Sequence, residues 1–238
     1  MPQTVYYAAA VQRLVEAGEE RPVSFSVPTG NFGNVLAGYI AKRMGLPIDR
    51  LIVASNRNDI LTRFLASGAL EMDTVYPTHS PSMDIQVSSN LERLLFDAHE
   101  RSGAAVAGLQ QRFRSEGRVE VDQSAVERIR EEFDGARVDD SATVEIIRNV
   151  AETTGVTIDP HTAVGVGAVR ERNAAADSAV VTLATAHPAK FPEVVAEAVG
   201  HRPALPDHLR DLFERPEKMT TLANDLDVVE AFVRDIAG

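Results

Sequence analysis

The chain has 238 residues, and its 44% apolar and 25% charged residues are typical of a globular protein with a sizeable core. It contains no cysteine, which excludes disulfides, thiolate metal sites and thiol nucleophiles. The net charge of −11 argues against a nucleic-acid surface, and no apolar run approaches the length that spans a bilayer. We therefore expect a cytoplasmic protein with neither nucleic acid nor membrane as its partner.

The chain opens with a helical pattern. Residues 3–17 carry apolar side chains at helical intervals, and Gly18 follows as a stop. A strand pattern comes next, since Val23, Phe25 and Val27 alternate with small polar residues. Nothing ahead of the first helix offers neighbouring strands to bury this one, so we expect the chain to begin partway through a fold.

A glycine loop joins this strand to the next helix. Pro28 and Gly30 end the strand pattern, and an apolar helix begins near Gly33. The glycines let a ligand approach the backbone, and the loop amides and helix dipole favour an anion such as phosphate. Neither a Walker lysine nor the third glycine of a dinucleotide fingerprint is present, so those two motifs are excluded. A tight turn without a ligand is the alternative interpretation.

The alternation of strand and helix continues. Residues 50–55 form a β-rich run, and residues 59–67 carry a helical pattern. This series implies a parallel sheet with a site at the carboxyl ends of its strands. Asn56 and Arg63 fall at or near that edge, where the arginine fork suits a phosphorylated substrate. The alternative is that Arg63 is a solvated helix residue.

A polar loop follows. Residues 72–90 are rich in Ser, Pro and Asn and end before the helical pattern LERLLF. This composition predicts a structured loop with many hydrogen-bond donors. Ser89 or Asn90 is expected to serve as the N-cap of the next helix.

The middle of the chain is helical and charged. Residues 103–154 contain three amphipathic pieces that end at glycines, with Ser124 and Ser141 as expected N-caps. The segment shows no catalytic constellation. We interpret it as a helical insertion that covers the sheet or shapes the entrance to a site.

The last predicted strand is the most apolar one. After a helix that begins near Pro160, residues 178–185 form a nearly continuous apolar run. This run predicts a strand that is buried on both faces and ends at Thr185. From the pattern alone, a threonine there is more often a strand former than a ligand contact. Two short helices are expected within residues 201–238.

Four stretches of sequence carry a family resemblance. In chain order they are SVPTGNFGNVLAGYIAKRMGLPI, ASNRNDILTRFLASG, THSPSMDIQVSSNLERLLF and ATAHPAKF. Together they resemble threonine synthase, a pyridoxal-phosphate enzyme of the tryptophan-synthase-β fold type. The resemblance implies an α/β fold with the partial parallel sheet of fold type II pyridoxal-phosphate enzymes. It divides the chain into a cofactor part (1–100), a helical insertion (101–157) and a return strand with carboxyl-terminal helices (158–238).

The resemblance also implies a cofactor, a substrate and their contacts. The cofactor is pyridoxal phosphate, and the residues implied to bind it are Gly30, Asn31, Phe32, Gly33, Asn34 and Thr185. The threonine hydroxyl is expected at the pyridine nitrogen, where a neutral group makes the ring a tempered electron sink. The implied substrate is O-phosphohomoserine, which reacts with water to give threonine and phosphate. Asn56 and Arg63 are expected to contact it.

One residue of the family pattern is missing. A pyridoxal-phosphate enzyme needs a lysine that holds the cofactor as a Schiff base. The chain has only Lys42, Lys190 and Lys218, and none lies in the Phe-Lys-Asp word that the family carries in its amino-terminal part. We therefore expect no catalytic residue in this chain, which would work with the missing amino-terminal part, in an enzyme that can be oligomeric.

Two alternatives stay open. The first is a non-catalytic relative that keeps the phosphate loop without the lysine, and the second is a sibling threonine or serine dehydratase. No metal is expected, because the six histidines show no metal-binding spacing.

Overall fold

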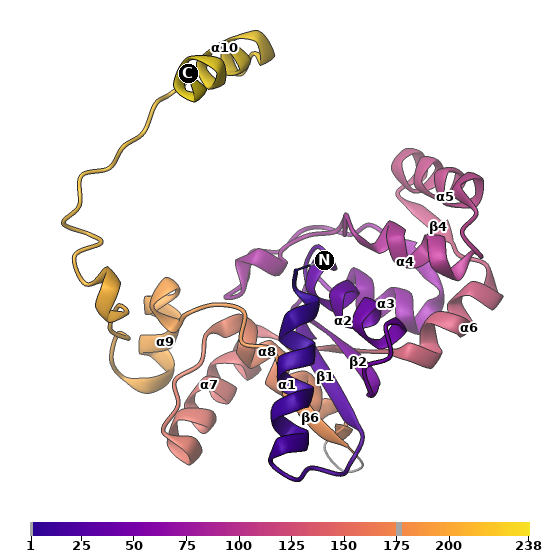
Figure 1. The fold of residues 1–238 in the computed structure, drawn as a ribbon, viewed down its shortest axis with the longest axis horizontal. Coiled ribbons are helices and arrows are strands. Elements are labelled where there is room, and N and C mark those ends of the chain that lie inside the picture. Colours follow the sequence, from indigo (N-terminus) through magenta and orange to yellow (C-terminus); the bar gives the residue numbers. More distant parts are fainter. Residues whose placement is uncertain (1, 175–177) are drawn as a thin grey trace. The chain divides into compact units, whose positions relative to one another are not determined.

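Figure 1 shows the computed structural model, which describes residues 2–174 and 178–238. The chain divides into two compact units, Met1–Pro203 and Ala204–Gly238, which are described separately. The first unit runs through α1 (Thr4–Glu16), β1 (Val23–Pro28), α2 (Gly33–Arg43), β2 (Ile48–Ser55), α3 (Ile60–Ser67), β3 (Ala69–Glu71), η1 (Pro81–Met83), α4 (Leu91–Ala98), α5 (Gly103–Glu116), β4 (Arg118–Glu120), α6 (Gln123–Glu132), β5 (Phe133–Arg137), α7 (Asp140–Thr154), α8 (Pro160–Glu171), β6 (Ala179–Thr182), η3 (Pro188–Lys190) and α9 (Pro192–Val199). Among the described residues, no helix is both long and apolar enough to cross a membrane.

Four parallel strands form the main sheet, in the order β5-β2-β1-β6. The strands predicted at 22–27, 50–55 and 179–185 are confirmed as parallel neighbours, although β6 already ends at Thr182. Because all four strands run the same way, their carboxyl ends meet at one edge of the sheet. The glycine loop, residues 29–32, leaves the sheet at this edge.

Helices cover both faces of the sheet, as expected for a parallel sheet in an α/β protein. Successive residues of a strand point to opposite faces, and those of β2 sort into two cores. Leu51 and Val53 pack in the core that contains α1 to α6, whereas Ile52 and Ala54 pack in the core with α7, α8 and α9. The polar residues that follow β2 are therefore carried by a strand that is fixed from both sides.

The segment 101–157 is mainly helical, as expected, but it also contributes two strands. β5 pairs in parallel with β2, so the FDGAR stretch is a strand of the main sheet and not the end of a helix. Gly135 lets α3 approach closely there, because an added Cβ would lie 3.2 Å from the Thr62 Cα of α3. β4 pairs antiparallel with β3 in a separate two-stranded sheet. The division of the chain into three parts stays an interpretation.

The serines predicted as N-caps in this segment are not caps. Ser124 and Ser141 lie inside the first turns of α6 and α7, and the N-cap positions belong to Asp122 and Asp139. The carboxylate of Asp139 accepts a hydrogen bond from the Ala142 N–H at 2.9 Å. In each case an aspartate two residues before the serine is the N-cap residue. Both residue types are favoured at this position, so the pattern alone could not distinguish them.

The prediction that the last strand is buried on both faces is wrong in this chain. β6 lies at an edge of the sheet, and of its residues only Ala179 is buried. Its apolar sequence is that of a central strand, but no strand among the described residues pairs with its outer side. Burial depends on neighbours, which a local pattern cannot supply.

The second unit contains η4 (Asp207–Leu209) and α10 (Leu226–Ala237). The helix expected around DLDVVEAFVRDI is confirmed, and Asp225 caps it by accepting from the Val228 N–H at 3.1 Å. The stretch PDHLRDLF forms only a short 3-10 turn. The apolar residues of α10 with large exposed side chains are Leu226, Val228, Val229, Val233 and Ile236.

Candidate functional site

The loop after β1 turns sharply into α2. Thr29 still follows the sheet, because its N–H donates to the Ala54 carbonyl at 2.9 Å. Phe32 then adopts a left-handed backbone (φ 62°) at the N-cap position of α2. A bulky residue keeps this conformation only where its surroundings fix it. The Phe32 ring is buried, with its centroid 5.8 Å from that of Phe133, and this packing holds the turn.

The N–H groups at the start of α2 are free. A helix leaves its first N–H groups without intrahelical partners. Those of Gly33, Asn34 and Val35 find no acceptor elsewhere in the described part of the chain. The helix dipole adds positive potential at the same point. No Lys or Arg lies between Pro22 and Ala41, so the backbone supplies this potential.

Two residues from the loop before α4 hold the other side of the turn. Ser88 Oγ donates to the Gly30 carbonyl at 2.9 Å, and Asn90 Nδ2 donates to the Asn31 carbonyl at 2.7 Å. In a trans peptide the C=O and N–H groups point in opposite directions, so the N–H groups of Asn31 and Phe32 face away from these anchors. Asn90 occupies the N-cap position of α4 as expected, but its side chain caps no N–H, and its Oδ1 accepts from Arg93 Nη1 at 2.7 Å instead.

Gly30 is required by a close backbone approach. An added Cβ at this position would lie 2.6 Å from the Ser82 carbonyl oxygen of η1, closer than real contacts allow. The Ser82 N–H in turn donates to Nε2 of His161 at 3.3 Å, and Nδ1 of His161 lies 3.0 Å from Asp159 Oδ1. A backbone N–H can only donate, so Nε2 is the acceptor. Nδ1 therefore carries the hydrogen and donates a hydrogen bond to Asp159.

Asp159 anchors this chain of contacts. The residue is 1% exposed and accepts further hydrogen bonds from the His161 N–H and the Thr162 hydroxyl. Burial raises the pKa of Asp159, but the hydrogen bonds from His161 and Thr162 outweigh burial and hold that pKa below its ordinary value. The charged carboxylate therefore fixes the imidazole that supports η1 against Gly30.

α1 supports the start of α2 from another direction. Tyr7 is fully buried, and its hydroxyl donates to the Asn34 carbonyl at 2.8 Å. Burial raises the pKa of Tyr7, so the phenol stays protonated and can donate. Gly38 admits the ring, because an added Cβ there would lie 2.5 Å from the Tyr7 ring.

Residues 72–90 fold around Asp84. Its carboxylate accepts from Asn56 Nδ2 at 2.8 Å and from Asn58 Nδ2 at 2.9 Å. The Thr78 hydroxyl also donates to it, at 2.6 Å. The two asparagines are 1% and 5% exposed, so they depend on this acceptor. The sequence analysis did not single out Asp84, although two asparagines directly after a strand signal a need for a partner.

The two residues expected to contact substrate make contacts within the protein. Asn56 gives its amide to the Asp84 cluster, as described above. Arg63 Nε donates to Asp59 Oδ1 at 2.9 Å, and its Nη2 donates to the Glu71 carbonyl at 3.0 Å. Arg63 is thus a residue of α3 whose side chain is 33% exposed and is paired with Asp59. A substrate contact by either side chain stays a prediction.

Thr185 lies beyond the end of β6. Its side chain is exposed, and its hydroxyl has no hydrogen-bond partner in the described part of the chain. Strands β1 and β6 pair in parallel with Ser26 opposite Thr182, so Thr185 follows the same edge of the sheet as the glycine loop. That one cofactor reaches both places stays a prediction.

Of the three lysines, Lys42 lies away from the first N–H groups of α2. Lys42 Nζ donates to the Asp49 carbonyl at 2.6 Å, near the amino end of β2 and thus at the opposite edge of the sheet. Lys190 is exposed in η3, with Nζ 5.9 Å from the centroid of the Phe191 ring. Lys218 belongs to the second unit.

Comparison with known proteins points to one family. Residues 162–233 match the family model described as threonine synthase, C-terminal. The threonine synthase of Pseudomonas aeruginosa is 52% identical over 234 residues, which are 98% of this chain and 50% of that protein. The threonine synthase of Corynebacterium glutamicum is 39% identical over 99% of this chain and 50% of its own length. The chain thus spans about half the length of the curated relatives it matches.

Solved structures agree with the sequence comparison. A pyridoxal-phosphate-bound threonine synthase from Brucella melitensis has a TM-score of 0.90 and 51% identity, over 99% of this chain and 50% of that one. Yeast threonine synthase has a TM-score of 0.86 and 36% identity, over 99% and 51% of the two chains. These structures confirm the predicted fold type II architecture. A threonine deaminase, with a TM-score of 0.51 and 15% identity, shows a shared fold alone.

Proposed function

We propose a function from one premise: the chain belongs to the threonine synthase family and corresponds to its carboxyl-terminal portion. In this proposal the loop Gly30–Asn34 binds the phosphate of pyridoxal phosphate, and Thr185 contacts the cofactor ring. The observation that carries it is the set of free N–H groups at the start of α2, in a turn whose carbonyls are held on the other side. These N–H groups and the helix dipole can bind a phosphate without a cationic side chain.

The roles of the chain's own residues follow from the geometry. Pyridoxal phosphate supplies an electron sink for reactions at an amino acid. The N–H groups of Gly33, Asn34 and Val35 bind the phosphate dianion and so fix one end of the cofactor. The free hydroxyl of Thr185 orients the other end and, being neutral, does not hold a proton on the ring nitrogen. The Asp159–His161 pair keeps η1 against Gly30 and thereby preserves the shape of the loop.

We extend the proposal to the reaction of the whole protein, from O-phosphohomoserine and water to threonine and phosphate. The chain then contributes the phosphate loop, and the amino-terminal part contributes the lysine that holds the cofactor. Two facts support this division: the chain spans about half the length of its relatives, and Lys42 lies at the opposite edge of the sheet. The chain alone is therefore expected to make no threonine.

Binding by the chain can be tested with pyridoxal phosphate and pyridoxal, which differ only in the phosphate. We expect pyridoxal phosphate to bind at least about tenfold more tightly, since several charge-assisted hydrogen bonds are at stake. Gly33→Val should remove this preference by crowding the donors. Gly108→Val is the matched control, because Gly108 is a helical glycine of α5 that faces open space. Equal binding of the two compounds, or an unchanged preference in Gly33→Val, would place the phosphate elsewhere.

Activity can be tested by adding the amino-terminal part of a complete threonine synthase to the purified chain. We expect threonine formation from O-phosphohomoserine only in the mixture. Borohydride reduction of the chain alone with pyridoxal phosphate should leave Lys190 without a stoichiometric pyridoxyl label. Turnover by the chain alone together with a labelled Lys190 would refute the division of labour. Cofactor binding without any turnover in the mixture would favour a non-catalytic relative.

A further inference from the structure

A pocket lies beside residues 86–92, the segment whose Ser88 and Asn90 hold the glycine loop. It has a volume of about 260 Å³ and lies between α3, β3, α5 and the residues that lead into α4. Its apolar wall is made by Ile60, Leu61, Leu70, Leu91 and Phe113, all at most 5% exposed. None of the loop residues Gly30–Asn34 lines it. Ser88 and Ser89, whose hydroxyls bond to the loop, form part of the wall.

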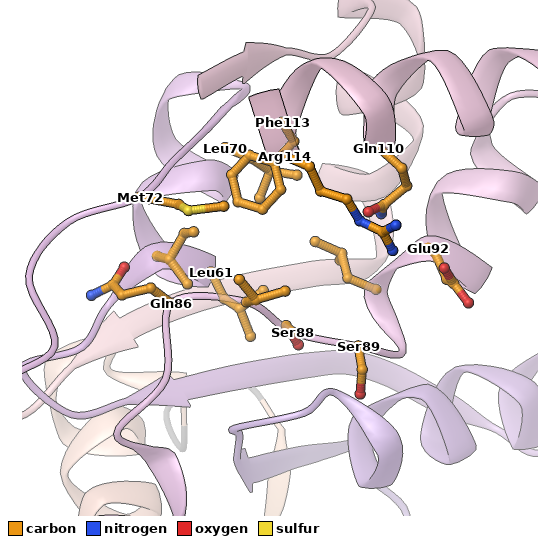
Figure 2. A pocket seen from close by; sticks show the side chains of 13 residues that line it. Leu61, Leu70, Met72, Gln86, Ser88, Ser89, Glu92, Gln110, Phe113 and Arg114 are labelled. Atoms are coloured by element: carbon orange, nitrogen blue, oxygen red, sulfur yellow. The ribbon is translucent and has the colours of Figure 1, made fainter. Parts of the chain in front are cut away.

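The two charged side chains of the pocket lie on one side. Figure 2 shows Arg114 and Gln110 of α5 together with Glu92 of α4, opposite Met72 and Leu61. Arg114 is exposed, and its guanidinium makes no hydrogen bond or ion pair with any other described residue. Its planar guanidinium therefore presents an unused fork, which matches the two oxygens of a carboxylate.

The second charge restricts the kind of carboxylate. Glu92 lines the same side, and its only ion pair with a described residue is a long one, with Arg93 at 3.9 Å between half-exposed side chains. A simple carboxylic acid bound to Arg114 would be repelled by this neighbouring carboxylate. A ligand that carries an ammonium group beside its carboxylate satisfies both residues at once. That arrangement is the head group of an α-amino acid.

The apolar wall defines the rest of the ligand. The volume is below the range of drug-sized pockets, so the ligand is small. Met72 and Val87 stand at the pocket with 37% and 52% of their surfaces exposed, and a ligand side chain of branched hydrocarbon would cover them together with the buried leucines. Gln86 and Ser88 also line the pocket, but they already donate to the Thr74 and Gly30 carbonyls, so a polar ligand side chain would gain less here than an apolar one.

We propose that this pocket binds a free α-amino acid with an aliphatic side chain. Arg114 takes the carboxylate, Glu92 takes the ammonium, and the wall around Leu61, Leu70 and Phe113 takes the side chain. The proposal does not depend on the proposed function, because it involves neither the phosphate loop nor Thr185. A binding measurement without cofactor therefore tests it separately.

The experiment is calorimetric titration of the folded 238-residue chain with L-leucine, with glycine and 4-methylpentanoate for comparison. We expect leucine to bind with an affinity of about 1 mM or better. Glycine lacks the apolar side chain and 4-methylpentanoate lacks the ammonium, so both should bind at least about fivefold more weakly. Leucine that gives no heat, or binds no better than either compound, would overturn the proposal.

Two variants locate the site. Arg114→Gln should weaken leucine binding by about tenfold or more, since a charge-assisted pair is lost. The control is Arg112→Gln, because Arg112 is exposed on the same helix and does not line the pocket. Glu92→Gln should weaken leucine binding but strengthen that of 4-methylpentanoate, which loses a repulsive neighbour. Both residues lie near the surface, so circular dichroism should show unchanged folding. Equal effects of the two arginine variants, or a Glu92→Gln variant that binds both compounds as before, would overturn the proposal.

Discussion

The loop after β1 and the segment after β6 leave the sheet at the same edge, but the protein holds them very differently. The loop is fastened by Ser88 and Asn90, pressed by η1 and supported by Tyr7. Thr185, in contrast, follows an edge strand, is exposed and has no partner among the described residues. The glycine loop is fixed by contacts within this chain, whereas no described residue bonds to the Thr185 side chain. Changes near the loop should therefore alter stability, and changes at Thr185 should not.

The largest effect on stability is expected at Asp84, around which residues 72–90 fold. Asp84→Ala removes the acceptor of Asn56, Asn58 and Thr78 and should lower the free energy of unfolding by about 3 kcal/mol. Asp73→Ala is the control, because Asp73 is exposed in the same segment and, among the described residues, its side chain bonds only to the neighbouring Thr74 N–H. Chemical denaturation measures both variants. Equal losses would mean that the network around Asp84 contributes little.

Two glycines of the glycine loop separate the effect of packing from that of the proposed ligand contact. Gly30→Ala forces a Cβ to within 2.6 Å of the Ser82 carbonyl and should cost about 2 kcal/mol of stability. Gly33→Ala places a Cβ no nearer than 3.5 Å to any neighbour, so its cost should stay within about 0.5 kcal/mol. Thermal unfolding of the two variants checks this contrast. A Gly30→Ala variant as stable as the parent would show that η1 moves away freely.

A smaller effect is expected from the hydroxyl that holds the loop. Ser88→Ala loses the 2.9 Å bond to the Gly30 carbonyl and should reduce stability by about 1 kcal/mol. Its neighbour Ser89 makes only a 3.4 Å bond to an exposed side chain, so Ser89→Ala should change stability by less than about 0.5 kcal/mol. Denaturant midpoints of the two variants, measured side by side, give the difference. If Ser89→Ala proved the more damaging change, the account of how the loop is fixed would fail.

The sequence was most informative where structure is local. The alternation of Val23, Phe25 and Val27, followed by glycines and a helical pattern, predicted β1, the loop and α2 within a residue or two. The parallel sheet followed from the order of strands and helices. Resemblance then supplied the fold type, which the solved structures confirm.

What the sequence could not supply depends on contacts between distant segments. Asp84 gains its meaning from Asn56, 28 residues earlier. His161 meets the Ser82 N–H across 79 residues, and nothing in the sequence near either residue reveals the other. β5 was missed because Gly135 resembles a helix stop. In the structure this glycine instead lies in a strand that α3 approaches closely. β6 was judged by its apolar residues alone, and its position at the sheet edge is a property of the whole chain.

The smallest effect on stability, and the sharpest test of the comparison, is expected at Thr185. Valine has nearly the same shape as threonine, so Thr185→Val removes only the hydroxyl. Because that hydroxyl is exposed and unpartnered among the described residues, stability should change by less than about 0.5 kcal/mol. The control is Thr143→Val, since Thr143 is 1% exposed and donates to the Asp139 carbonyl at 2.8 Å, a loss of about 1 kcal/mol.

A role toward the cofactor predicts the opposite ranking when binding is measured. In the chain combined with an amino-terminal part, Thr185→Val should weaken the binding of pyridoxal phosphate by about fivefold, which corresponds to the loss of one hydrogen bond. Thr143→Val should leave this binding unchanged. A strand-forming role for Thr185 predicts instead that both stability and binding stay the same, because valine forms strands as well as threonine does. The two measurements together therefore decide between the interpretations that the sequence left open. They also test the difference between a site held by its own chain and a residue that acquires a partner only when the ligand is bound.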